Sequence, residues 1–223
     1  MSRSVVPLSA DHLDGLPARC GACLFWELGR PRPDPTIRPD EDELAGDARV
    51  QKGAWITAQT LDGFPPGRVV LRDGQIAAFA LFGAPGTFAR RRHPVPPASD
   101  DALFLATIRV DAAARGGGLG KLLLRESIRA AIEADLRAVE AYADRRYRDH
   151  DCVLPSQWLL HHGFEVHAEH PRYPLLRLEV KRTLRWAESL EQALDEILER
   201  MPRRVPLPQQ APVPRSGSTR VDR

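Results

Sequence analysis

The sequence predicts an α+β fold in which strand and helix patterns alternate along most of its 223 residues. Residues 67–72 and 75–83 are apolar runs joined by Asp73-Gly74, a pair that favours the tight turn of a β-hairpin. Residues 102–110 have the apolar, β-rich composition of a central strand. Residues 118–136 place leucines and isoleucines at near-helical spacing, which indicates an amphipathic helix.

The remaining elements follow in order along the chain. Expected strands lie at 5–9, 137–143, 164–170 and 175–182; expected helices run from Ala10, from 40 to about 60, at 156–163 with Gly163 as its end, and at 189–201 with Ser189 as its cap. Two proline-rich stretches, 30–40 and 83–101, are expected to be loops because proline lacks the N–H that a helix needs. We therefore expect one domain over residues 1–201, followed by a disordered Arg/Pro-rich tail at 202–223.

The composition excludes several classes of protein. The chain carries 32 Lys+Arg against 30 Asp+Glu, and this balance argues against a protein that coats nucleic acid. No apolar run approaches the length that spans a bilayer, and the first residues lack the apolar core of a secretory signal. Three cysteines are too few for a disulfide framework. We expect a cytoplasmic protein without membrane or nucleic-acid partners.

A glycine-rich turn between the central strand and the central helix is the most informative segment. Glycines there allow backbone conformations that other residues avoid, and they let a ligand approach the main chain. Free N–H groups at the start of a helix, where the helix dipole is positive, suit a phosphate or pyrophosphate. The turn consists of Arg115, Gly116, Gly117, Gly118, Leu119, Gly120 and Lys121.

Two common phosphate-binding motifs do not fit this turn. A P-loop ending at Gly120-Lys121 would need glycine at position 115 and Ser or Thr at position 122, where the chain has Arg115 and Leu122. A dinucleotide fingerprint would need glycine at position 121 or 123, where the chain has lysine and leucine.

The turn resembles the acetyl-CoA-binding motif of the GCN5-related N-acetyltransferase (GNAT) superfamily. That motif is a strand ending in V-x-P-x-x-R-G-x-G-x-G, and only the proline is missing here. The matching residues are Val110, Arg115, Gly116, Gly118 and Gly120, with Ala112 in place of the proline. The order of elements over about residues 5–180 is also similar to the family, as is His162-Gly163-Phe164 after the late helix. The resemblance implies a mixed, mostly antiparallel central sheet flanked by helices.

The resemblance also implies a function. Acetyl-CoA would be the cosubstrate, with no metal, and an acetyl group would move by direct attack to the primary amine of an unidentified small molecule or peptide. The protein would supply positioning, oxyanion stabilisation and proton removal. The family is often dimeric, so a homodimer is compatible with it. The implied cofactor-binding residues are Ile108, Arg109 and Val110 beside the pantetheine arm, and residues 115–121 around the pyrophosphate.

The usual proton carriers of the family are absent from this sequence. The central strand contains no carboxylate between Leu103 and Val110, and Leu159 stands where many members have a tyrosine. No catalytic residue is therefore assigned. The candidates by position are Glu140, Tyr142, Tyr147, Cys152 and His161, each of which also has a purely structural explanation; a water chain is a further candidate base. The absence of the usual proton carriers leaves open an alternative function, a CoA-sensing or protein-interaction module that does not catalyse acetyl transfer.

Other polar clusters have more than one interpretation. Cys20 and Cys23 form a C-x-x-C that fits buried thiols, half of a zinc site, or a redox pair. The acidic run Asp40–Glu43 would attract a cationic acceptor or simply stabilise a helix start. Residues 90–93 (Arg-Arg-Arg-His) would contact the 3′-phosphate of CoA, a nucleic acid or a partner, or form a solvated loop.

Overall fold

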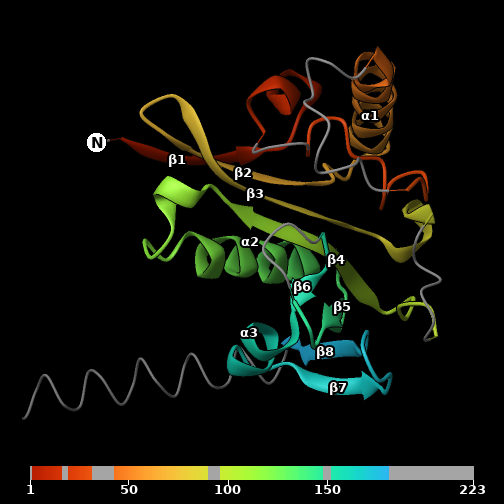
Figure 1. The fold of residues 1–223 in the computed structure, drawn as a ribbon. Helices are drawn as coiled ribbons and strands as arrows, with labels where there is room; N and C mark the ends of the chain where they lie inside the picture. Colours follow the sequence, from red (N-terminus) through yellow and green to blue (C-terminus); the bar gives the residue numbers. More distant parts are fainter. Residues whose placement is uncertain (1, 17–19, 32–42, 90–95, 148–151, 181–223) are drawn as a thin grey trace, which may run out of the picture. The chain divides into compact units, whose positions relative to one another are not determined.

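An eight-stranded mixed sheet organises the chain in the computed structural model (Figure 1). Seven strands follow the order β1-β2-β3-β4-β5-β8-β7, and the short β6 pairs with β5. The structure describes residues 2–16, 20–31, 43–89, 96–147 and 152–180. The strands are β1 (Arg3–Pro7), β2 (Gly67–Arg72), β3 (Gln75–Gly83), β4 (Ala102–Val110), β5 (Ala138–Asp144), β6 (Leu154–Pro155), β7 (Glu165–Ala168) and β8 (Leu175–Glu179).

Helices cover both faces of this sheet. The α-helices are α1 (Glu43–Leu61), α2 (Leu119–Glu133) and α3 (Ser156–His161), and the 3-10 turns are η1 (Ala10–Gly15), η2 (Pro85–Thr87) and η4 (Ala112–Ala114). Most strand pairs are antiparallel, and only β4–β5 and β5–β6 are parallel. The predicted fold class, a mixed and mostly antiparallel sheet with flanking helices, is therefore confirmed.

The predicted elements match the structure best where the sequence signal is local. The hairpin and the central strand have the predicted bounds. The first strand lies at Arg3–Pro7 instead of 5–9, because Ser9 already serves as the N-cap of η1. Helix α2 ends at Glu133, and the chain leaves it through Asp135 with a left-handed φ of 54°. The predicted closing helix and the tail lie outside the described residues.

Strands β4 and β5 separate after a short stretch of pairing. In the described residues their parallel ladder joins only Ala102–Phe104 to Ala138–Glu140. Further along, the pairing of β4 with β3 shifts register between Leu81 and Phe82, and β5 pairs with β6 from Ala143. The two central strands therefore part, and the second half of β4 has no β5 ladder on that side.

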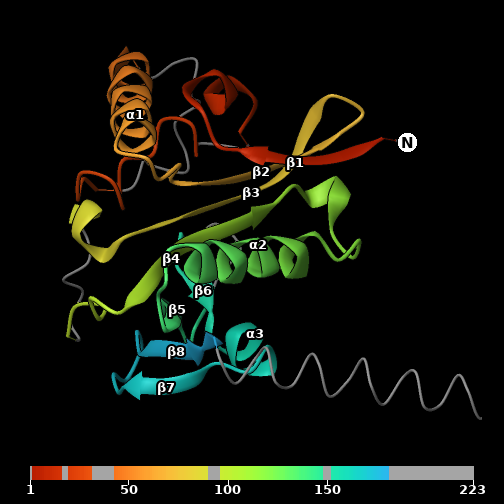
Figure 2. The ribbon, with the colours of Figure 1, turned by 180° about the vertical axis from the view of Figure 1, so that it is seen from behind.

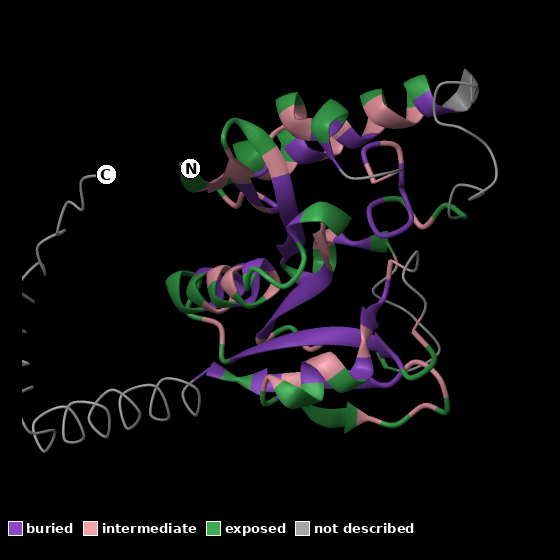
Figure 3. Cartoon of the chain, turned by 60° about the vertical axis from the view of Figure 1, so that its left-hand side comes forward, coloured by how far each residue is buried: buried purple, intermediate pink, exposed green. Residues whose placement is uncertain are grey.

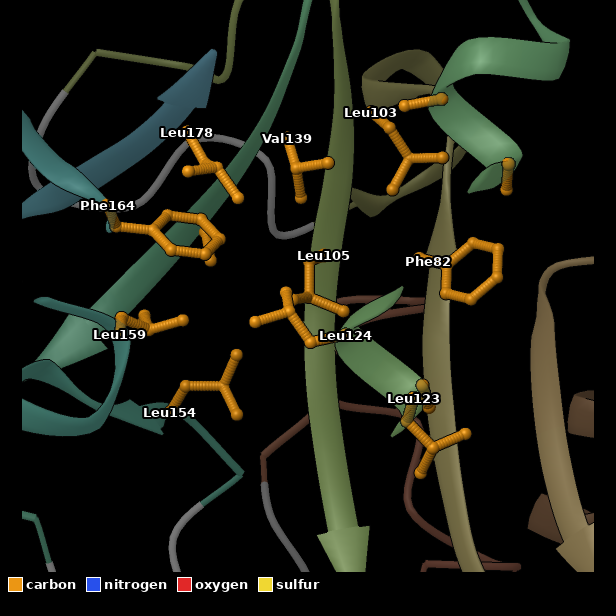
Figure 4. Close-up of a cluster of buried hydrophobic side chains, with 14 of the residues drawn as sticks. Phe82, Leu103, Leu105, Leu123, Leu124, Val139, Leu154, Leu159, Phe164 and Leu178 are labelled. Carbon is orange, nitrogen blue, oxygen red and sulfur yellow. The ribbon is translucent and has the colours of Figure 1, made fainter. Parts of the chain in front are cut away.

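Two apolar cores lie on opposite faces of the sheet. Strand β4 points Leu103 and Leu105 into one core and Phe104 into the other, as the alternation of a strand requires. The first core packs under α2 and α3, where Leu124, Leu159 and other apolar side chains converge (Figure 4). The burial pattern in Figure 3 shows α2 with one buried and one exposed face, as an amphipathic helix requires.

The second core contains most of the aromatic side chains. Trp26 makes an edge contact with Phe104 at 5.4 Å between ring centroids and stacks on Tyr142 at 6.2 Å. Together with Phe88, these rings fix the N-terminal segment against β4 and β5. The reverse view in Figure 2 shows α1 and η1 beside strands β1–β3, away from α2.

A buried charge network holds the paired ends of β4, β5 and β8. Glu140 is fully buried; it accepts hydrogen bonds from Arg177 Nη1 at 2.7 Å and from the Ser99 main chain at 2.7 Å. Arg177 also donates to Asp101 at 2.9 and 3.0 Å, and these hydrogen bonds lower the pKa of Asp101. Arg177 therefore compensates the charge of Glu140 where the sheet is closed.

Replacing Arg177 should destabilise the fold. Arg177→Ala leaves the carboxylate of Glu140 buried without its guanidinium partner, so the free energy of unfolding should fall by about 3–5 kcal/mol. Glu179→Gln is the matched control, because it removes a half-exposed partner of the same guanidinium and should cost less than about 1 kcal/mol. Urea unfolding measures both, and equal losses would contradict a buried role for the Glu140–Arg177 pair.

Candidate functional site

The turn after β4 is held in place before the glycines begin. Asp111 donates its main-chain N–H to Ala77 on β3 at 2.9 Å, and its carboxylate accepts from the main chain of Ala113 at 2.9 Å. These bonds fix η4 to the end of the hairpin strand. Ala112, which replaces the proline of the family motif, lies within this capped turn, so Asp111 supplies a restraint that the proline would otherwise give.

The glycines shape the start of α2. Gly116 and Gly118 have φ values of 77° and 73°, and Gly118 is the N-cap of the helix. Both positions need left-handed backbone, which glycine adopts without a steric penalty. A Cβ at either position would meet no atom within 4 Å, so this side of the turn is open.

The main-chain N–H groups of this turn point to an anion site. In the described residues, none of the N–H groups from Gly116 to Lys121 donates to a protein acceptor, and the first recorded helical bond is Leu122 N–H to Gly118 at 3.0 Å. The first N–H groups of a helix have no intrahelical partner and lie at the positive end of its dipole. They form a cradle for a negatively charged group.

A cavity of about 290 Å³ lies beside this cradle. One wall comes from the second half of β4, and the opposite wall comes from β6 and α3, across the gap where β4 and β5 have parted. It is lined by Ile108, Arg109, Val110, Arg115, Gly120, Tyr147, Leu154, Pro155 and Trp158. A Cβ on Gly120 would lie 3.4 Å from the Trp158 ring, so glycine keeps this end of the cavity open.

Five of the ten predicted cofactor residues line this cavity, and the other five lie on the adjoining turn. Ile108, Arg109 and Val110 line the cavity, together with Arg115 and Gly120. Of the other five, four are exposed on the turn: Gly116, Gly117, Gly118 and Lys121. The Leu119 side chain is buried in the core, so only its main chain is available at the turn.

A further cation approaches the turn from a distant part of the sequence. The Arg72 guanidinium, at the end of β2, lies 3.3 Å from the position of a Cβ on Gly117. Sequence reasoning did not identify Arg72, because its place beside the turn depends on the pairing of β2 and β3 next to β4. Arg72, Arg115 and Lys121 together supply positive charge to the cradle.

Two of the five catalytic candidates lie in structural environments away from the cavity. Glu140 is engaged by Arg177 and Ser99 at the paired end of β5. Tyr142 is buried between Trp26 and Phe104, and its hydroxyl donates to the main chain of Pro96 at 3.1 Å. Both side chains are accounted for by the packing and hydrogen bonding of the core.

Of the remaining candidates, Tyr147 is the one that lines the cavity. Its hydroxyl accepts a hydrogen bond from Arg109 Nη1 at 3.5 Å. His161 is exposed on α3 and makes a ring contact with His162. Cys152 lines a different and much smaller cavity, against Cys23. The structure therefore brings one of the five candidates to the cavity beside the glycine turn.

The smaller cavity, about 20 Å³, lies on the other side of β4 and shares Arg109 with the first. It contains all three cysteines, with the Cys23 and Cys152 sulfur atoms 3.8 Å apart. A buried ion pair between Lys52 and Glu27 lies against it, and Lys52 also donates to the Cys23 carbonyl at 2.8 Å. Burial alone would lower the pKa of Lys52, but Glu27 raises it above its usual value.

The cysteines differ in their ionisation. Burial raises the pKa of Cys20 to about 11, so Cys20 stays a thiol at neutral pH. A hydrogen bond from Cys152 lowers the pKa of Cys23, and the Lys52 charge lowers it further against the effect of burial, to about 7. Among the residues that the structure describes, no group of three or more His, Cys, Asp or Glu is arranged to hold a metal ion.

A larger cavity, about 470 Å³, lies elsewhere, at the β7–β8 edge of the sheet. Its lining includes Arg177 and Asp101, which already bond to each other, and it has no glycine turn or free helix start beside it. We therefore place the candidate site at the cavity of about 290 Å³ next to residues 116–121. The acidic run Asp40–Asp42 and the basic run at 90–93 lie outside the described residues. Within the described ranges, no helix has the length and apolar character needed to cross a bilayer.

Comparison with known proteins decides the family. The family model described as acetyltransferase (GNAT) family matches residues 24–150, which is more than half of the chain. The chain belongs to the GNAT acetyltransferase family. The match contains β4, the glycine turn and α2, so the predicted resemblance is confirmed. The search of curated proteins gives no match for this chain.

Solved structures with the same fold support this assignment. The PaiA N-acetyltransferase of Thermoplasma acidophilum, solved in complex with coenzyme A, aligns with a TM-score of 0.53 and 11% identity over 80% of this chain and 99% of that chain. An N-acetyltransferase of Staphylococcus aureus Mu50 aligns with a TM-score of 0.52 and 18% identity, over 81% of this chain and 99% of that chain. The yncA protein of Salmonella typhimurium, a putative acetyltransferase solved with its cofactor acetyl-CoA, aligns with a TM-score of 0.51 and 17% identity. The alignment covers 81% of this chain and 95% of that chain. At these identities the likeness establishes the GNAT fold.

The left-handed turn at Gly118 can be tested by its effect on stability. Gly118→Ala places a Cβ on backbone with a φ of 73°, so the free energy of unfolding should fall by about 1–2 kcal/mol. Gly46→Ala is the control: it lies in α1 with no atom within 4 Å of its added Cβ, and alanine there should stabilise the helix by about 0.5–1 kcal/mol. Chemical denaturation measures both, and a neutral Gly118→Ala would contradict the left-handed N-cap.

Proposed function

We propose that this GNAT protein is an acetyl-CoA-dependent N-acetyltransferase that transfers an acetyl group to the primary amine of a small molecule or peptide. The observation that supports this most strongly is the position of the unbonded N–H groups of residues 116–121 at the mouth of the cavity between β4 and β6. A diphosphate on these groups and an extended arm along Ile108 and Val110 would occupy two adjoining parts of one site.

The cavity suits an elongated, partly apolar ligand with an anionic end. Leu154, Pro155 and Trp158 provide an apolar wall opposite the β4 edge. That edge has no β5 ladder beyond Phe104, so its main-chain groups are placed to pair with the amides of a pantetheine arm. Arg72, Arg115 and Lys121 would compensate the phosphate charge at the other end.

The chemistry proposed for the site is direct attack of a neutral amine in a ternary complex. Acetyl-CoA supplies the thioester carbon that the amine attacks. The chain would contribute by holding both reactants in one geometry and by donating a main-chain N–H near Val110 to the developing oxyanion. Arg109 lines the cavity beside the glycine turn and also the smaller cavity on the other side of β4.

Tyr147 is the proton carrier that we propose, because it lines the cavity and contacts Arg109. It would protonate the departing thiolate. The family's late-helix tyrosine is replaced here by Leu159, which is buried in the core, so Tyr147 would take that role from the segment after β5.

The cradle can be tested with a charge placed inside it. Gly118→Glu adds a carboxylate where the diphosphate would lie, so the Kd for acetyl-CoA should rise at least tenfold, about 1.4 kcal/mol, by titration calorimetry. Gly63→Glu is the matched control, since Gly63 has a similar left-handed φ of 91° and open surroundings but lies after α1. Equal affinity in both variants would contradict the placement of the diphosphate, and absence of acetyl-CoA binding in the wild type would contradict the proposed function.

The role of Tyr147 predicts a loss in turnover without a loss in binding. In Tyr147→Phe, kcat should fall by about 10²–10⁴ while the Kd for acetyl-CoA stays the same, because only the proton-carrying hydroxyl is removed. Release of CoA thiol in a panel of amines measures kcat. His161→Ala is the control, since His161 is exposed on α3 and should leave turnover unchanged. Unchanged kcat in Tyr147→Phe would exclude Tyr147 as the proton carrier.

A further inference from the structure

The three cysteines form a cluster that the acetyl-transfer chemistry does not use. Cys20 and Cys23 come from the N-terminal segment, and Cys152 comes from the segment that leads into β6. All three lie outside residues 24–150, the range matched by the family model. The three are described, and none forms a disulfide.

The sulfur atoms of Cys23 and Cys152 are in contact. They lie 3.8 Å apart and share a hydrogen bond, although 129 positions separate them in the sequence. The two segments are also joined by the Trp26 indole, whose Nε1 donates to the Cys152 carbonyl at 3.3 Å. This contact holds the two sulfurs close, and a disulfide would require them to approach to about 2.05 Å.

The surroundings of Cys23 favour a thiolate. The Lys52 ammonium donates to the Cys23 carbonyl, and the Cys152 thiol donates a hydrogen bond that holds the pKa of Cys23 at about 7. Cys20 has no such hydrogen bond, and burial raises its pKa to about 11 although the Arg109 and Lys52 charges act to lower it. The thiolate is the form of cysteine that reacts with oxidants. The adjoining cavity of about 20 Å³ has room for about one water-sized molecule.

We propose that Cys23 and Cys152 are an oxidant-sensitive pair that forms a disulfide with hydrogen peroxide. The Cys23 thiolate attacks one peroxide oxygen; the O–O bond breaks, and hydroxide leaves and takes up the proton that Cys23 released. The resulting sulfenic acid is attacked by Cys152, which forms the S–S bond and expels a second water. The two thiols lose two electrons, and one peroxide becomes two waters.

The disulfide would form next to one wall of the functional site. Cys152 is two residues before Leu154, which lines the cavity beside the glycine turn, and Cys23 lies in the cavity on the other side of β4. Oxidation would therefore tie the N-terminal segment to the segment that enters β6. The inference does not depend on the proposed acetyl transfer, because the contact of the two sulfurs stands without it.

The test is peptide mapping of the full-length protein. Reduced protein is exposed to one equivalent of hydrogen peroxide, denatured, alkylated with iodoacetamide and digested. The expected product is a linked Cys23–Cys152 peptide that has lost two hydrogen atoms, with Cys20 fully alkylated. Three alkylated cysteines after peroxide, a Cys20–Cys23 link, or a link between two chains would overturn the proposal.

Matched variants separate the roles of the three thiols. Cys20→Ser should form the same linked peptide at the same rate, because Cys20 takes no part. Cys152→Ser should stop at a sulfenic acid on Cys23, which dimedone traps. Loss of the link in Cys20→Ser, or absence of a dimedone adduct in a folded Cys152→Ser, would contradict the assignment. The wild-type mapping stands without the variants if one of them does not fold.

Discussion

The separation of β4 from β5 is the constraint on which the rest of the site depends. A continuous parallel ladder would satisfy the main chain of both strands and leave no opening at the centre of the sheet. Here the ladder ends at Phe104 and Glu140, β4 remains paired to β3 on its other side, and β5 takes β6 as its partner. The cavity beside Ile108 and Val110 exists because of this divergence.

The two ends of the central strands have opposite chemistry. At the closed end, Glu140, Arg177 and Asp101 satisfy one another, and their network stabilises the sheet without leaving a reactive group free. At the open end, the glycine turn and the start of α2 leave main-chain donors without protein partners. Apolar side chains such as Leu105 and Leu154 fill the space between the two ends (Figure 4). Under the proposed function, stability and ligand binding would thus be carried by different parts of the same strands.

Elements with a local sequence signal were predictable, whereas elements that depend on contacts between distant segments of the chain were not. The hairpin, the central strand and the glycine turn have local signals: Asp73-Gly74, an apolar run, and glycines before a helix. Strand β6 was not predicted, because Leu154–Pro155 is too short for a periodic pattern and contains a proline. The pairing of β5 with β6, which helps to open the cavity, therefore had no signal in the sequence.

The same limit applies to the side chains of the site. The roles of Glu140 and Tyr142 could not be separated from that of Tyr147 by position alone, because burial and hydrogen-bond partners depend on how distant segments pack. Arg72 lies beside the glycine turn because β2 and β3 pair next to β4. Cys152 contacts Cys23 although 129 positions separate them in the sequence. Sequence patterns located the glycine turn that we propose as an anion cradle, whereas the residues around it became visible only from the three-dimensional arrangement.

The most direct test of the account is an amide ¹H–¹⁵N titration of the protein with acetyl-CoA. The account predicts that the largest shifts fall on residues 116–121, with a second group on Ile108 and Val110 and a change at the Trp158 indole. Titration with adenosine 3′,5′-bisphosphate, which lacks the pantetheine arm, should leave Ile108 unshifted. Shifts confined to the cavity at β7 and β8, with the glycine turn unaffected, would contradict the account.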